Sequence, residues 1–126
     1  MPNLTPSETL RAAAARLREL AERANPGPWR FDDSDADFQP CVKGMRAEWI
    51  AECGPVDSIT APGARGDHDA HWIATMSPAV AEPLAREMEM HATWIACVEG
   101  DPTRYSYTVG RAEYMLIFAA SILEVR

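Results

Sequence analysis

The stretch ANPGPWRF, residues 24–31, marks the boundary between a helical and an extended part of the chain. Proline disfavours helix in the residue before it, so Pro26 and Pro28 end any helix that arrives from the N-terminal side. The last three residues, WRF, alternate apolar and polar side chains, as a strand does. The stretch therefore predicts a helix before it and a β-rich segment after it.

The residues before this stretch have the pattern of one amphipathic helix. TPSE at residues 5–8 is a capping box, in which Thr5 caps the helix and Glu8 reaches back to it. Apolar side chains then recur at helical spacing from Leu10 to Ala24, and charged side chains lie mostly off that stripe. We expect this helix to bury one face.

Three short segments after the stretch have the pattern of strands: 29–31, 41–43 and 49–53. Strict alternation over the last of them places Trp49, Ala51 and Cys53 on one face. Gly44 suits a hairpin turn between the second and third segments. We expect an antiparallel meander of two or three strands, and a sheet this small must lean on the helices.

The rest of the chain predicts three helices, whose starts carry a capping acid or a proline: Asp67, Ser77-Pro78 and Asp101-Pro102. Pro83 falls about one turn into the second helix, so we expect a kink or a restart at Glu82.

The apolar residues of the last two helices predict how these helices pack. In the second we expect these residues in the core: Val80, Leu84, Met88, Trp94, Ile95, Cys97 and Val98. Tyr114 to Leu123 is apolar nearly all round, and such a helix is surrounded by other elements or by a partner subunit. The fold class is thus α+β: an N-terminal helix, a small antiparallel meander and three helices, in a single domain over 1–126.

Composition narrows the class of protein. The net charge of −7 argues against direct binding of a nucleic-acid backbone. No run reaches the roughly 18 apolar residues of a membrane span. Residues 1–6 lack the pattern of a secretory signal, and three cysteines without tight spacing suggest free thiols. We expect a cytoplasmic protein.

Two metal sites can be tested on spacing. Asp33, Asp35 and Asp37 fit positions one, three and five of a calcium loop, but Phe38 and Gly44 stand at positions six and twelve, where glycine and glutamate are required. The second candidate is a zinc site, and its ligands would be Cys41, Cys53, His68 and His71. Their spacing matches no standard zinc motif. We expect no metal and no cofactor.

Enzyme signatures are also missing. Asp67, His68, Asp69 and His71 offer acid–base groups, but no nucleophile motif accompanies them, and helix capping explains the acids. The sequence has no phosphate-binding glycine motif. We expect a non-enzymatic protein.

Two blocks carry a family resemblance: the opening that ends in PGPW at 26–29, and DAHWIATMSP at 69–78. They resemble a family of small proteins of actinobacteria and their bacteriophages, and more loosely the Ea22-like phage early proteins. The similarity covers roughly residues 5–31 and 66–88, and the family usually has threonine where Asn25 stands. The resemblance implies no catalytic residues. It implies a gene of phage or prophage origin, whose product acts on a host protein or neutralises a host defence.

We therefore expect an interaction protein that forms a homo-oligomer and binds a host protein. The binding surface would comprise the acidic segment and nearby aromatic and polar residues: Asp32, Asp33, Asp35, Asp37, Trp49, Asp67, His68, His71 and Trp72. The alternative is a protein that sequesters a nucleotide-like molecule in a pocket between subunits. In that case tryptophans among Trp29, Trp49, Trp72 and Trp94 would stack on the base, and Arg46, Arg65, Arg104 or Arg111 would pair with phosphates.

Overall fold

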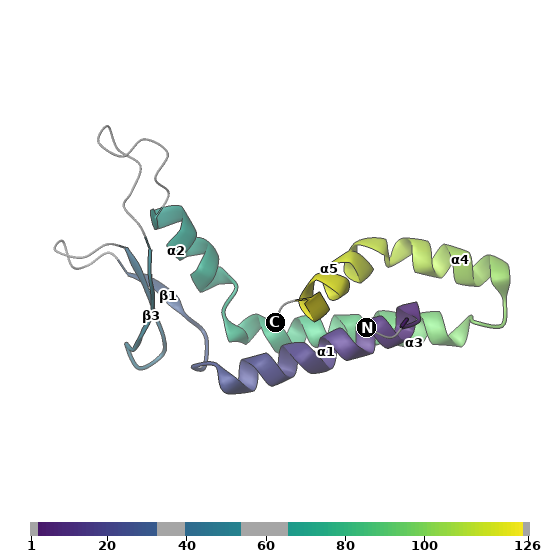
Figure 1. Ribbon diagram of the computed structural model, residues 1–126, viewed down its shortest axis with the longest axis horizontal. Coiled ribbons are helices and arrows are strands. Elements are labelled where there is room, and N and C mark those ends of the chain that lie inside the picture. Colours follow the sequence, from purple (N-terminus) through teal and green to yellow (C-terminus); the bar gives the residue numbers. More distant parts are fainter. Residues whose placement is uncertain (1–2, 33–39, 54–65, 125–126) are drawn as a thin grey trace. The chain divides into compact units, whose positions relative to one another are not determined.

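The computed structural model describes residues 3–32, 40–53 and 66–124, and within them the chain is α+β, as the sequence predicts. It forms two compact units (Figure 1). The helical unit comprises Met1–Leu20 and Ala81–Arg126, and the sheet unit comprises Ala21–Val80. The elements, in chain order, are α1 (Pro6–Arg23), β1 (Arg30–Asp32), β2 (Cys41–Lys43), β3 (Trp49–Glu52), α2 (Gly66–Thr75), the 3-10 turn η1 (Pro78–Val80), α3 (Ala81–Cys97), α4 (Pro102–Arg111) and α5 (Glu113–Glu124).

Both ends of α1 follow the local sequence. The backbone N–H of Thr5 donates to Glu8 Oε2 at 2.9 Å, and that of Glu8 donates to Thr5 Oγ1 at 3.3 Å, which confirms the capping box. The helix ends at Arg23, before the Pro-Gly-Pro sequence. The indole N–H of Trp29 then donates to the carbonyl oxygen of Asn25 at 3.0 Å and closes the turn into the sheet unit.

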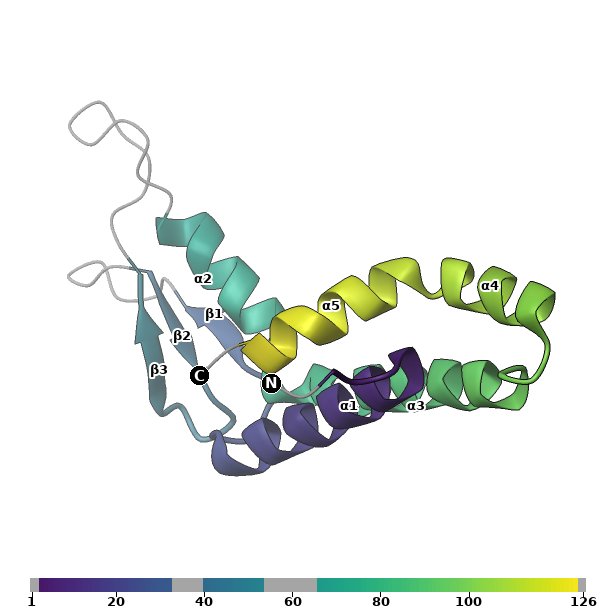
Figure 2. The same cartoon turned by 45° about the vertical axis from the view of Figure 1, so that its right-hand side comes forward.

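The sheet is antiparallel in the order β1-β2-β3, which confirms the predicted meander (Figure 2). The alternation predicted over 49–53 is wrong. On β3, Ala51 pairs with Val42 but Trp49 pairs with Lys43, so a bulge intervenes. Because neighbouring positions on β2 point to opposite faces, the bulge places Trp49 and Ala51 on opposite faces of the sheet.

A hydrophobic cluster packs α2 against the sheet. Val42 and Ala70 are fully buried, and Ile73 and Ala74 pack against them. Gly27 lies at a close approach in the same unit. A Cβ atom at this position would lie 2.8 Å from the backbone nitrogen of Ala79, so only glycine fits without a backbone shift.

The core of the helical unit combines small and large side chains from α1, α3 and α5. Five alanines are fully buried: Ala13, Ala14, Ala85, Ala92 and Ala119. Small side chains allow helix backbones to approach closely, and α1 lies alongside α3 (Figures 1 and 2). The large side chains of this core with no exposed surface are Leu10, Met88 and Ile95.

Two expectations for α3 need correction. Cys97, predicted in the core, is exposed, and Trp94 is 49 % exposed, because both lie outside the face formed by the buried alanines and Met88. The restart expected at Glu82 comes one residue earlier, at Ala81, after the turn η1. Pro83 thus lies in the first turn of α3, where a missing N–H costs no hydrogen bond.

The last predicted helix is divided into α4 and α5 around Ala112. The start of α4 is as predicted, since Asp101 accepts a hydrogen bond from the Arg104 backbone N–H. In α5, however, Tyr114 is 86 % exposed and Ile117 is 57 % exposed. The fold therefore covers only one side of this apolar helix. No helix in the described ranges is both long and apolar enough to span a membrane.

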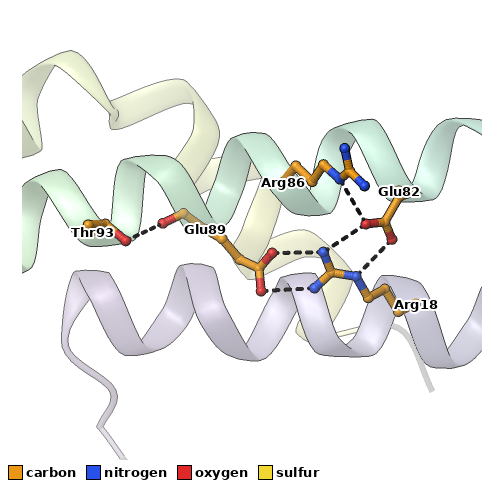
Figure 3. Close-up of polar contacts among 5 residues, drawn as sticks. All are labelled: Arg18, Glu82, Arg86, Glu89 and Thr93. Carbon is orange, nitrogen blue, oxygen red and sulfur yellow. Dashed lines mark hydrogen bonds and ion pairs between the residues drawn. The ribbon is translucent and has the colours of Figure 1, made fainter.

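A charged cluster ties α1 to α3 (Figure 3). The Arg18 guanidinium forms a two-bond pair with the Glu82 carboxylate, at 2.9 and 3.1 Å, and another with Glu89, at 2.8 and 2.7 Å. Glu82 also accepts a hydrogen bond from Arg86 Nε at 3.1 Å. These bonds lower the pKa of Glu82 to about 2, and the Arg18 bonds hold the pKa of Glu89 below its usual range.

Replacing Arg18 by lysine is expected to lower the Tm at pH 7, because an ammonium group cannot form two bidentate pairs. A lowered carboxylate pKa stabilises the fold above the ordinary value of 4.5, and this contribution is lost as the pH falls toward about 2. The Tm difference between the wild type and Arg18→Lys should therefore shrink over that range. Arg11→Lys is the control on the same helix. An equal effect at pH 7 and pH 2 would contradict the assignment.

Candidate functional site

The acidic segment is only partly described. Asp33, Asp35 and Asp37 lie outside the described residues. Asp32 belongs to β1 and is buried, and its carboxylate contacts Arg30 Nη1 at 2.8 Å and Lys43 Nζ at 3.2 Å. Asp32 thus lies in a strand, where its carboxylate is an internal partner of two cations, and not in an exposed acidic loop.

Three of the predicted residues on α2 share one side of the helix. Asp67 lies in the first turn of the helix rather than before it. His68 is exposed, and the His71 ring stacks on Phe31 with the ring centroids 3.9 Å apart. Trp72 is 70 % exposed. His68, His71 and Trp72 are three and four residues apart, whereas Ala70 faces the sheet from the other side of the helix.

The other candidate residues of the sheet unit, Trp49, Cys41 and Cys53, contribute to its packing. Trp49 is half exposed, and Lys43 Nζ lies 5.5 Å from the centroid of its ring. Cys41 and Cys53 are free and buried, and burial raises the pKa of both thiols. Across the described ranges, no three His, Cys, Asp or Glu side chains gather as a metal site would require.

A pocket of about 530 Å³ lies in the helical unit, between α3 and α4. Its volume falls within the range of small-molecule sites. The pocket is lined by seven residues: His91, Trp94, Cys97 and Val98 from α3 and its C-terminal turn, and Arg104, Thr108 and Arg111 from α4. Each set has helical spacing of three or four residues, so each helix contributes one face. One wall is therefore mainly aromatic and apolar, and the other is cationic.

The aromatic wall is built on Trp94. Its indole is 49 % exposed, and the His91 ring stands edge-on to it, with centroids 5.1 Å apart and an interplanar angle of 82°. His91 Nε2 lies 3.3 Å from the Glu87 carboxylate. An exposed indole beside cations can stack on a planar ligand.

The cationic wall differs from the other basic clusters of the protein. Arg16, Arg18, Arg30, Lys43 and Arg86 all contact carboxylates. Among the described residues, no carboxylate contacts the guanidinium of Arg104 or Arg111. Arg111 Nη1 instead donates to Tyr107 Oη at 3.1 Å. In a chain of net charge −7, the pocket thus holds two guanidinium groups without an acidic partner in the part of the chain that the structure describes.

Sequence reasoning found this site only in part. Trp94, Arg104 and Arg111 were candidates for stacking and phosphate pairing, whereas His91, Cys97 and Thr108 were not. The spacing of Arg104, Thr108 and Arg111 does predict one helix face. No local pattern shows, however, that the turn after α3 brings this face against Trp94.

Comparisons with known protein families, with curated proteins and with solved structures each find no match to this chain. The pocket geometry is thus the basis for a functional hypothesis.

Proposed function

We propose that this protein binds a small, planar, anionic molecule, such as a nucleotide, in the pocket between α3 and α4. The observation that carries the proposal is an exposed indole in the same pocket as two guanidinium groups that contact no carboxylate of residues 3–32, 40–53 and 66–124. Guanidinium groups bind phosphate with charge-assisted hydrogen bonds, and an indole stacks on a base. The site is formed within one protomer, whereas the sequence suggested a pocket between subunits.

The first test is binding of a nucleotide panel, measured by calorimetry with the wild type and with Arg104→Gln and Arg111→Gln. Each variant is expected to weaken binding about tenfold or more, because one charge-assisted hydrogen bond is lost. Arg46→Gln removes an exposed arginine that does not line the pocket, and it should leave affinity unchanged. Absence of binding across the panel would overturn the proposal.

Cys97 provides an independent readout of the same pocket. It is the exposed thiol, whereas Cys41 and Cys53 are buried. A ligand in the pocket should slow alkylation of Cys97 by a maleimide, and Arg104→Gln should restore the unprotected rate. Protection that persists in Arg104→Gln would place the ligand elsewhere.

The protein is also proposed to form a homo-oligomer through the exposed side of α4 and α5. A groove there is lined by Ser106, Val109, Gly110, Glu113, Leu116, Ile117 and Ala120. Two large side chains, Tyr114 and Ile117, lie between the small residues Gly110 and Ser121 along one stripe. In an antiparallel pair, Tyr114 meets Ile117 of the second copy, so apolar side chains form the centre of the contact.

Native mass spectrometry of gently purified protein is expected to show a dimer, and Ile117→Lys is expected to give a monomer, because a buried ammonium group lacks a partner at this interface. Met45→Lys places the same charge on another exposed apolar residue and should leave the dimer intact. A monomeric wild type would refute the interface. The same spectrum would reveal a retained small molecule as added mass.

A second candidate function is interaction with a host protein, which the phage-type resemblance implies. Its support is the exposed side of α2, where Trp72 and Met76 lie one turn apart with exposed fractions of 70 % and 42 %. Exposed aromatic and methionine side chains are common anchors of protein interfaces. Trp72→Ser should weaken a host complex and leave nucleotide binding intact.

A further inference from the structure

Resting on the proposed ligand binding, we infer that the pocket recognises molecules with two separate anionic groups, one held by Arg104 and the other by Arg111. Two phosphates at separate positions of a nucleoside should therefore bind better than two phosphates joined in a diphosphate.

The spacing of the two arginines is the first observation. Arg104 lies in the first turn of α4, and Arg111 is its last residue. Seven residues of α-helix correspond to a rise of roughly 10 Å. Helical side chains lean toward the N-terminus of their helix, so two side chains on one face lean in the same direction and keep this separation.

The position of the Arg111 guanidinium is the second observation. Its Nη1 donates to Tyr107 Oη at 3.1 Å, and its Cζ lies 5.8 Å from the centroid of the Tyr107 ring. Tyr107 thus holds the Arg111 head group by one hydrogen bond and a cation–π contact.

The residues between the arginines fit a ligand body rather than a third anion. Thr108 lines the pocket between them on α4 and offers one hydroxyl, and Trp94 lines the opposite wall. The arrangement therefore favours a planar group beside Trp94, with anionic groups at two ends of the molecule.

Two isomeric probes carry two phosphates at different spacings. ADP carries its two phosphates in one chain, and adenosine 3′,5′-bisphosphate carries them on opposite sides of the ribose. We expect calorimetry to show that the bisphosphate binds about tenfold more tightly than ADP, since only it satisfies both guanidinium groups. Arg104→Gln and Arg111→Gln should each reduce the bisphosphate affinity to that of AMP. Arg46→Gln should change none of these affinities.

Tyr107→Phe tests how Arg111 is held. It keeps the ring but removes the hydroxyl group that accepts from Arg111, so the preference for the bisphosphate over ADP should decrease while AMP binding is retained. Equal affinities of ADP and the bisphosphate, or tighter binding of ADP, would overturn the inference and leave the proposed function standing. Failure of all three nucleotides to bind would overturn both.

Discussion

Replacing Asp32 by asparagine is expected to lower the free energy of unfolding of the sheet unit by about 3 kcal/mol. The Asp32 side chain is 8 % exposed and contacts both Lys43 and Arg30, and the Lys43 side chain is itself only 20 % exposed. Loss of the carboxylate charge leaves Lys43 partly buried without its counter-ion, which costs more than the loss of a surface ion pair.

Urea unfolding followed by tryptophan fluorescence measures this effect. A Trp94→Phe background restricts the signal to Trp29, Trp49 and Trp72, which all belong to the sheet unit. Asp69→Asn is the matched control, because Asp69 is an exposed acid of the same unit and its replacement should cost under about 0.5 kcal/mol. Equal effects of the two variants would contradict the internal role of Asp32.

The Asp32 result also bears on the host-protein hypothesis. A variant with serine at all four acidic positions, 32, 33, 35 and 37, would remove the internal ion pairs of Asp32 together with three further charges. Reduced partner capture by that variant would therefore not separate unfolding from the loss of a binding residue. The hypothesis is tested with Asp33, Asp35 and Asp37 replaced and Asp32 retained, and unchanged capture by this triple variant would argue against a role of the segment.

Truncating Met88 to alanine is expected to destabilise the helical unit by about 3 kcal/mol. Met88 has no exposed surface, and its buried neighbours on α3 and α1 include alanines that cannot extend to fill a cavity. The lost transfer free energy therefore adds to the cost of the cavity.

Thermal and urea unfolding followed by circular dichroism measure the loss. Met90→Ala removes the same atoms from the same helix, but Met90 is 41 % exposed, so this control should cost much less. Met88→Leu keeps most of the volume and should cost under about 1.5 kcal/mol. Similar values for Met88→Ala and Met90→Ala would show that Met88 does not fill the core.

The candidate pocket shows where prediction from sequence stopped. The sequence alone identifies Trp94, Arg104 and Arg111 as residue types suited to binding a planar anion. The sequence does not show that these three residues lie together, because that depends on two helix faces that meet only after the turn at Gly100 and Asp101. For the acidic segment the sequence predicted too much. Its density of charge suggested an exposed surface that includes Asp32, whereas Asp32 is buried beside two cations.

Local sequence was sufficient to place most elements. The capping box at Thr5, the prolines at 26 and 28, and the Asp101-Pro102 helix start act through the backbone of a few adjacent residues, so they have the same effect in any tertiary context. Only the tertiary structure determined the bulge that separates Trp49 from Ala51, the exposure of Cys97 and the uncovered side of α5. Each of these depends on which segments, distant in sequence, pack against one another, and periodicity within a single segment carries no information about its neighbours.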